Sequence, residues 1–156
     1  MTDGDPRPPT LLALPSYLAG HFSRIGHRRL QEALAEHDLR LPHFAVLAGL
    51  SDFGPLGQHE LADRLRLNRS HLVGYLDDVE QRGLVRRERD AADRRRQLVA
   101  LTAAGRKLLT RLKNVASRSQ DEFLSVLSES ERETLTTLLR RVVVAEDALS
   151  SSADGR

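Results

Sequence analysis

The sequence predicts a mainly α-helical fold with one small β-hairpin. Leu, Val, Ile and Ala supply most of an apolar content of 40%, aromatic residues make up only 4%, and Trp is absent, a composition that favours helices over strands. Apolar residues recur at helical spacing along most of the chain, and only residues 84–85 and 98–101 have the length and composition of strands. We therefore expect long helices towards both ends and a hairpin between them.

Composition excludes several kinds of site. The 156 residues suffice for one domain with a buried core, and the absence of Cys excludes disulfides, thiolate metal sites and cysteine nucleophiles. No apolar run approaches the roughly 20 residues of a membrane span. The stretch MTDGDPRPPT carries acids and prolines where a signal peptide carries bases and an apolar core. These features predict a cytoplasmic protein that has no membrane partner.

The N-terminal third is predicted to contain an arm and two helices. Residues 1–13 lack periodicity and hold three of the six prolines, so we expect a flexible arm. Apolar residues follow a helical period across residues 14–36, which predicts a long first helix. Pro42 suits the first turn of a second helix, which the stretch DFGP at residues 52–55 should end.

Two short helices joined by a tight turn are expected next. Leu61 and Leu65 place one helix against the core. Residues 72–79 carry the apolar stripe of another helix, which ends at Gly83, and residues 67–68 form the turn between the two. This arrangement is a helix-turn-helix candidate.

A β-hairpin, here called the wing, is predicted directly after these helices. Its strands, at residues 84–85 and 98–101, flank a stretch rich in arginine. Residues 82–96 contain seven arginines against three acids, a local balance of 7 − 3 = +4. Such a concentration of Arg is typical of a nucleic-acid or other anion-binding surface, although a solvated loop explains the charge equally well.

Capping signals predict two long helices in the C-terminal part. Thr102 is placed to cap a fifth helix, and the capping box SESE at residues 128–131 opens the last one. Helices within residues 14–40 and 106–148 exceed what a small core needs, so a homodimer would bury their apolar stripes more completely. Residues 149–156 are expected to be a frayed tail.

The motifs occur in a distinctive order: Glu60-Leu61-Ala62, Leu76 to Gly83-Leu84-Val85, Asp93-Arg94-Arg95 and Leu101-Thr102-Ala103-Ala104-Gly105. In this order, over residues 14–148, they resemble the MarR family of winged helix-turn-helix transcription regulators. The resemblance implies one domain, in which residues 14–40 and 106–148 are dimerisation helices and residues 41–105 form the winged helix-turn-helix. It also implies homodimers on pseudo-palindromic operators, often released by a small, frequently phenolic, ligand.

The start of the second helix of the motif is the expected DNA-reading surface. Polar side chains at the N-terminus of such a helix can reach base edges in the major groove. Ser70 and His71 should face outward, while Asn68 and Arg69 can also reach phosphate through the positive end of the helix. The alternative is a merely solvated helix start that Asn68 caps.

The wing is expected to contact DNA through its arginines. In the resembling family an arginine of this motif enters the minor groove, whose negative potential attracts guanidinium groups. We assign this role to Arg94 and assign Asp93 and Arg95 to an ion pair that stiffens the hairpin, although Arg94 and Arg95 could exchange roles. Three further arginines are expected as phosphate contacts or salt-bridged surface residues: Arg86, Arg87 and Arg96.

Two positions depart from the pattern of the resembling family. Gly74 and Asp78 stand where a basic or hydrogen-bonding residue is common. Either fewer bases are read directly, or Asp78 orients a neighbouring arginine.

The family resemblance also implies a ligand cleft between the first two helices and the dimer region. Tyr17, His21 and Arg24 follow one another at helical spacing on the first helix, and His43 with Phe44 begins the second. A basic or histidine group beside aromatic rings suits an aromatic carboxylate or a phenol. An equally good interpretation is that these residues only line a hinge between the dimerisation and DNA-binding parts.

Enzymatic and metal functions find little support. None of the six histidines forms an i, i+4 pair, so no metal site and no cofactor is predicted. Ser70 and His71 are adjacent, and adjacent helical residues do not face one another, so they are no catalytic pair. The sequence therefore predicts a sequence-specific transcription regulator, a repressor, that binds double-stranded DNA as a homodimer. The alternative is an architectural protein that binds DNA without sequence preference or ligand response.

Overall fold

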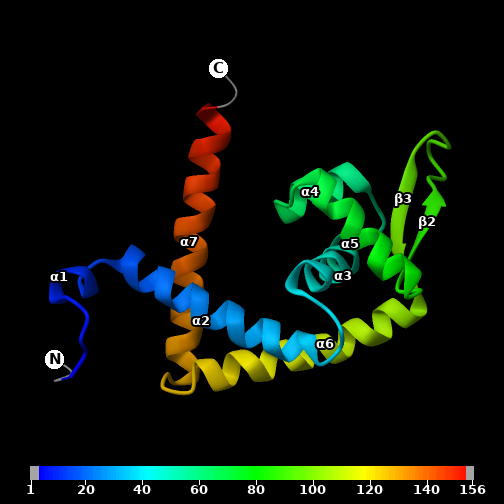
Figure 1. Ribbon diagram of the computed structural model, residues 1–156. Coiled ribbons are helices and arrows are strands. Elements are labelled where there is room, and N and C mark those ends of the chain that lie inside the picture. The colour runs from blue at the N-terminus through cyan, green and yellow to red at the C-terminus, as the bar shows by residue number, and fades with distance from the viewer. Residues whose placement is uncertain (1–3, 154–156) are drawn as a thin grey trace. The chain divides into compact units, whose positions relative to one another are not determined.

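The computed structural model describes residues 4–153, which form seven helices and three short strands (Figure 1). The chain divides into two compact units, one up to Gln120 and one from Asp121 onward. The elements in order are α1 (Pro9–Leu12), α2 (Pro15–Ala35), α3 (Leu41–Phe53), β1 (Leu56–Gly57), α4 (Gln58–Leu65), α5 (Arg69–Gln81), β2 (Val85–Arg89), β3 (Gln97–Leu101), α6 (Ala103–Phe123) and α7 (Glu129–Ala153). The predicted fold class is confirmed.

The N-terminal arm is more ordered than predicted. Pro9–Leu12 form one helical turn, α1, because Pro9 stands at the first helical position, where its missing N–H costs no hydrogen bond. Before it, Asp5 accepts hydrogen bonds from the backbone and side chain of Arg7, and the side-chain bonds are the main reason that the pKa of Asp5 falls to about 2. Residues 1–3 of the predicted arm lie outside the described residues.

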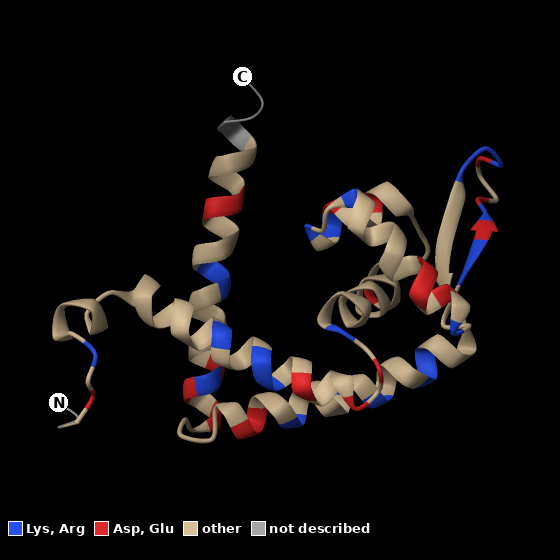
Figure 2. Ribbon diagram, viewed as in Figure 1, with Lys and Arg blue, Asp and Glu red and all other residues tan. Residues whose placement is uncertain are grey.

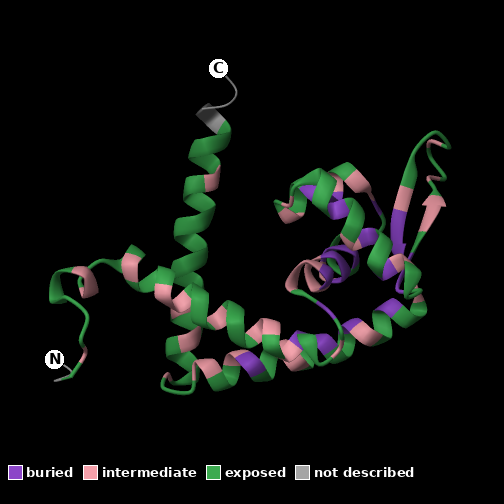
Figure 3. Cartoon of the chain, in the orientation of Figure 1, coloured by how far each residue is buried: buried purple, intermediate pink, exposed green. Residues whose placement is uncertain are grey.

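The core of the first unit lies where α3, α4 and α5 meet the sheet (Figure 3). Leu47 from α3, Leu61 from α4 and Leu72 from α5 are all fully buried there. Leu61 and Leu72 come from the apolar faces of amphipathic helices, as the sequence predicts, whereas α3 is apolar along most of its length. The turn between α4 and α5 begins at Arg66, whose left-handed backbone (φ 51°) ends α4 and redirects the chain into α5. The helix-turn-helix is therefore present.

The two strands of the wing belong to a three-stranded antiparallel sheet in the order β1-β3-β2. Val85 pairs with Leu101 and Arg89 with Gln97, so β2 and β3 make the predicted hairpin, with longer strands than expected. The third strand, β1, was not predicted because its two residues are too few to show an alternation of apolar and polar side chains. It pairs with β3 through Leu56 and Val99, which places β3 at the centre of the sheet.

The connection from the wing to α6 is tight. Thr102 caps α6 as predicted, since its hydroxyl oxygen accepts the backbone N–H of Gly105 at 3.0 Å while the hydroxyl donates to the Gly83 carbonyl at 2.6 Å. The backbone of Gly105 lies against Leu84, and a Cβ added to Gly105 would stand 2.0 Å from the Leu84 carbonyl oxygen. Only glycine fits this helix turn against the start of the wing.

The second unit consists of the end of α6, a short loop and α7. The predicted capping box is confirmed, because the Ser128 N–H donates to Glu131 and the Glu131 N–H donates to the Ser128 hydroxyl. Arg132 holds the loop by donating to the Leu124 and Leu127 carbonyls, each at 3.1 Å. The prediction of a frayed tail is wrong for residues 149–153, since α7 continues to Ala153; residues 154–156 lie outside the described residues.

Candidate nucleic-acid interface

The N-terminus of α5 is built by Asn68, which acts as its cap. The Asn68 side-chain oxygen accepts the backbone N–H groups of Ser70 at 2.9 Å and His71 at 3.3 Å, and also the Ser70 hydroxyl. This oxygen is therefore used for capping. The side chains of Ser70 and His71 are exposed, as expected for residues that face away from the buried stripe of α5.

Arg69 is tied to α4 and does not extend freely. Its guanidinium donates to both carboxylate oxygens of Asp63, at 3.2 and 2.8 Å, and this hydrogen-bonded pair is the main reason that the pKa of Asp63 lies below its ordinary value. The predicted contact of Arg69 with phosphate would have to compete with this pair. Sequence reasoning missed Asp63 because the partner lies on another helix.

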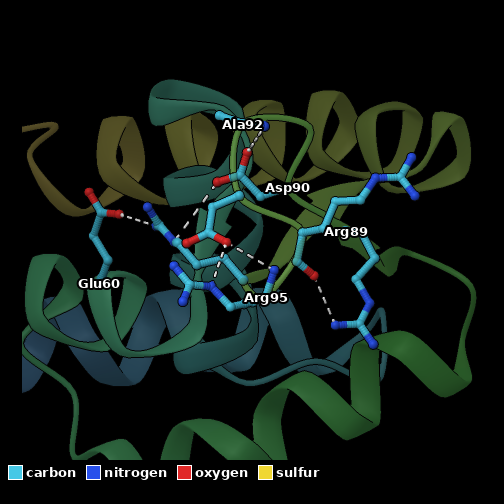
Figure 4. Close-up of polar contacts among 8 residues, drawn as sticks. Glu60, Arg89, Asp90, Ala92 and Arg95 are labelled. Carbon is cyan, nitrogen blue, oxygen red and sulfur yellow. Dashed lines mark hydrogen bonds and ion pairs between the residues drawn. The ribbon is translucent and has the colours of Figure 1, made fainter.

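The wing loop between β2 and β3 is held by hydrogen bonds among its own residues (Figure 4). Asp90 accepts the Ala92 N–H at 2.9 Å, and Asp93 accepts both the backbone N–H of Arg95 at 3.0 Å and its side-chain Nε at 3.2 Å. The predicted Asp93–Arg95 ion pair is thus present. The backbone N–H of Arg95 is the largest cause of the lowered pKa of Asp93, followed by its side chain. Arg89, which sequence reasoning missed, donates to the Arg94 carbonyl at 3.1 Å.

The three consecutive arginines of the wing differ in their partners. Arg95 pairs with Asp93, although its side chain is 93% exposed, and Arg96 lies 3.6 Å from Glu60 of α4 and 3.9 Å from Asp90. Within residues 4–151, the guanidinium of Arg94 has no hydrogen bond or ion pair. Figure 2 shows the basic residues at the tip of the wing. Arg94 is thus the member of this run best able to contact an external anion.

The arginines at the start of β2 are salt-bridged, which is one of the two predicted roles. Arg87 is bonded to Glu80 and lies 3.2 Å from Asp77, so two acids of α5 hold it and leave its side chain only 25% exposed. Arg86 pairs with Glu88 at 3.0 Å. These internal partners count against both arginines as phosphate contacts. Glu88 is a near neighbour of Arg86 in the sequence, whereas Glu80 and Asp77, like Glu60, lie on other elements, and no local motif indicates that they pair with these arginines.

The residues suggested for ligand binding separate into two groups. Tyr17 and His21 pack edge to face with ring centroids 4.6 Å apart, and an Nη of Arg24 lies 2.7 Å from Nδ1 of His21, so these three form one cluster on α2. The side chain of His43 has other partners than this cluster. Its Nδ1 accepts the Arg40 N–H, and its Nε2 lies 3.0 Å from the carboxylate of Asp78.

Both ring nitrogens of His43 are therefore occupied, and its predicted role as a ligand group is not supported. The hypothesis that Asp78 orients an arginine is wrong, since its partner is His43. Phe44 is half-buried and packs against the core. Within the described residues, no three His, Cys, Asp or Glu side chains gather into a group that could hold a metal ion. None of the described helices has the length and apolar content needed to cross a membrane.

Comparison with known proteins places this geometry in a family. The model of the MarR family matches residues 39–96, which run from the loop just before α3 through the wing loop. The transcriptional regulator HosA of Escherichia coli O157:H7 is 38% identical over 106 residues, which cover 68% of this chain and 78% of HosA.

Solved structures of transcriptional regulators are similar to this chain in fold. A probable transcriptional regulator from Pseudomonas aeruginosa is 31% identical with a TM-score of 0.69, over 79% of this chain and 95% of that one. The PcaV transcriptional regulator from Streptomyces coelicolor, in complex with its natural ligand, is 29% identical with a TM-score of 0.71, over 94% of this chain and 99% of that one. With a helix-turn-helix followed by an arginine-bearing wing, the chain belongs to the MarR family of transcriptional regulators.

Proposed function

We propose that this protein is a sequence-specific repressor that binds a pseudo-palindromic operator as a homodimer and releases it when a small aromatic acid or phenol binds. The observation that carries the DNA-binding part is the pairing pattern of the basic residues. Most arginines of the winged helix-turn-helix are neutralised by acids of the same chain, whereas Arg94 at the tip of the wing has no such partner within residues 4–151. A guanidinium without an internal anion is available to an external one.

The start of α5 would enter the major groove. Ser70 and His71 are exposed beside the positive end of the helix dipole, where a polar side chain can meet base edges and backbone N–H groups can meet phosphate. In a dimer the two helices would enter grooves about 10 bp apart. Binding across a promoter would block RNA polymerase, so we propose repression and not activation.

Arg94, and not Arg95, would enter the minor groove. Arg95 is engaged by Asp93, and leaving that carboxylate would cost a charge-assisted hydrogen bond. The backbone on either side of Arg94 is held by the bonds of Asp93 and by Arg89, so the loop would lose little conformational freedom on binding. This rigidity favours a defined position for the guanidinium of Arg94.

Dimerisation is supported by apolar side chains that remain exposed on α7. Leu138, Val142 and Leu149 lie on one stripe of this helix, and all three are exposed in the single chain. Exposed apolar surface of this extent on a soluble domain is typical of an interface. Leu14, the N-cap residue of α2, is exposed as well, and so are Leu18 and Ile25 within this helix.

Val142→Glu tests the dimer, with Val144→Glu as its matched control. The two valines are 64% and 59% exposed, and residues two apart on a helix point about 200° away from each other. Sedimentation velocity should show a dimer for the parent and for Val144→Glu, and a monomer for Val142→Glu. A monomeric parent, or two variants with the same effect, would contradict the proposed face.

The effector is proposed to bind at the Tyr17–His21–Arg24 cluster of α2. An Nη donor of Arg24 meets Nδ1 of His21, which fixes the His21 proton on Nε2 and leaves other guanidinium donors for a carboxylate. The Tyr17 ring offers an apolar edge for an aromatic ligand. The ligand-bound relative PcaV supports a ligand-responsive function, and the chemistry of the ligand here is inferred from the cluster alone.

The experiment that tests the proposal begins with selection from a duplex library that contains randomised positions. Enrichment of a pseudo-palindrome, and tight binding to it in fluorescence anisotropy against random competitor DNA, would support a specific regulator. Arg94→Ala should weaken binding to the selected duplex about tenfold, whereas Arg95→Ala, which removes the same charge from the same loop, should cost clearly less. His71→Ala should lower the ratio of specific to random affinity more than it lowers random affinity.

Binding that competitor DNA and moderate salt abolish, without an enriched sequence, would favour the architectural alternative. Benzoate, 4-hydroxybenzoate and phenol are then titrated into the complex with the selected duplex. Release by one of them in the parent, but not in Arg24→Gln, would support the proposed cluster. Release that is equal in both proteins would place the effector elsewhere.

A further inference from the structure

The loop between α2 and α3, residues 36–40, is bonded to the C-terminal half of the recognition helix α5. Arg82, the C-cap residue of α5, donates from one Nη to the Asp38 carbonyl at 3.1 Å and from the other to the His37 carbonyl at 3.2 Å. Asp38 has a left-handed backbone (φ 56°), which turns these carbonyls within reach of one guanidinium. One side chain thus joins the end of α5 to a loop more than 40 residues earlier.

His43 makes a second connection to the same half of α5. It is 5% exposed and stands in the first turn of α3. Nδ1 accepts the backbone N–H of Arg40 at 3.0 Å, so the ring proton of the neutral imidazole is on Nε2, which donates to Asp78 Oδ2 at 3.0 Å. The hydrogen bonds therefore assign the tautomer and give the carboxylate of Asp78 a buried donor.

Ring contacts complete this attachment. Tyr75, one turn before Asp78 on α5, meets the His43 ring edge to face with centroids 5.4 Å apart. The guanidinium of Arg40 lies 5.4 Å from the centre of the Tyr75 ring. Gln31 of α2 in turn accepts the Leu41 N–H at 3.1 Å, so the end of α2 is bonded to the same junction.

We propose that the loop–helix clamp, meaning the His43–Asp78 hydrogen bond and the bonds of Arg82 to the His37 and Asp38 carbonyls, sets the angle at which α5 presents its N-terminus to DNA. His43, Asp78 and Arg82 are positioning residues for sequence discrimination, and this role rests on the DNA-binding function proposed above. Asp78 stands ten residues after Asn68, about 15 Å along the helix. A tilt of a few degrees at the clamp moves the reading end by about 1 Å, which is enough to break a hydrogen bond to a base edge.

The clamp also explains an acid on a helix that binds DNA. An unpaired carboxylate at position 78 would only repel phosphates, whereas the carboxylate bonded to His43 holds the helix in place. These two effects of Asp78 have opposite signs. Removing its charge raises affinity for all DNA, and removing its hydrogen bond lowers discrimination between sequences.

Asp78→Asn and Asp78→Ala separate the two effects. Both remove the same charge, but only Asn keeps an oxygen that can accept the His43 Nε2–H. The full-length protein is compared in each form for affinity to the selected duplex and to random duplex, and for amide hydrogen exchange across α5 without DNA. Arg82→Ala is the second variant, and thermal melting verifies that all forms are folded.

Both Asp78 variants should bind random DNA more tightly than the parent to the same extent. Asp78→Ala and Arg82→Ala should lower the ratio of specific to random affinity roughly 3- to 10-fold, whereas Asp78→Asn should keep the parental ratio. Amide exchange in α5 should rise by a similar factor in Asp78→Ala and in Arg82→Ala, but not in Asp78→Asn.

Equal exchange in the two Asp78 variants overturns the clamp. Faster exchange in Asp78→Ala with an unchanged affinity ratio overturns its role in discrimination. If selection enriches no sequence, the proposed function has failed, and the exchange comparison still decides whether the clamp holds α5.

Discussion

The contact between Gly105 and the start of the wing predicts that Gly105→Ala is strongly destabilising. The added Cβ would stand 2.0 Å from the Leu84 carbonyl oxygen, whereas an ordinary carbon–oxygen contact is about 3.3 Å, so backbone must move by more than about 1 Å. That oxygen also accepts the Thr102 N–H at 3.1 Å, and moving it weakens this bond. Overpacking costs about 1–3 kcal/mol and a weakened hydrogen bond about 1 kcal/mol.

The helix propensity of Ala returns roughly 0.5–1 kcal/mol, so the free energy of unfolding should fall by about 1–3.5 kcal/mol. For a chain of this length, the melting temperature should fall by about 2–14 °C in a thermal scan at fixed protein concentration. Gly74→Ala is the matched control, because this residue is inside α5 and its added Cβ would meet no neighbouring atom within 4 Å. It should raise stability by about 0.5–1 kcal/mol. A Gly105→Ala protein that melts at or above the parent would refute the reasoning.

Thr102→Val removes the hydroxyl that caps α6 and should lower the free energy of unfolding by about 1–2 kcal/mol in a denaturant titration. Thr102→Ser keeps a hydroxyl and should retain most of the parental stability. Equal losses of stability in the two variants would contradict the cap. Asp93 should titrate below its ordinary pKa of 3.8, and because its folded-state pKa is depressed, its bonds stabilise the wing above that pH and are lost as pH falls through the folded value. In an NMR titration of the Arg95→Ala protein, the pKa of Asp93 should stay below 3.8, because the backbone N–H of residue 95, the larger cause of the lowered pKa, remains. A return of this pKa to 3.8 would show that the Arg95 side chain dominates. Arg132→Ala should speed amide exchange in residues 124–128 roughly tenfold, and unchanged exchange would show that the arginine does not hold this loop.

Features that depend on neighbouring residues were predictable from the sequence. The cap of Thr102 and the capping box at residues 128–131 join groups three residues apart, so their residue types are sufficient evidence for the helix starts. The apolar stripes of α4 and α5 likewise predicted the helix-turn-helix, because a helical period reports which face is buried. Too short to show a period, β1 was not predicted.

Features that depend on partners from other elements were not predictable. Charge counting alone does not distinguish the arginines of residues 82–96. In the structure, Glu80 and Asp77 hold Arg87, Glu60 approaches Arg96, and Arg94 has no such partner within residues 4–151. His43 had the residue type of a ligand group, yet the packing of α3 against α5 directs it to Asp78.

The sequence by itself determined the helical architecture, the wing and the family resemblance, because hydrophobic period, caps and motif order are properties of local chain segments. Only the tertiary structure decided which charges remain free and how α5 is held. An ion pair or hydrogen bond forms where folding brings two side chains within about 3 Å, and for Arg82 with the 36–40 loop that meeting spans more than 40 residues. Helix α5 is thus specified locally as a helix, and its placement is specified by distant contacts.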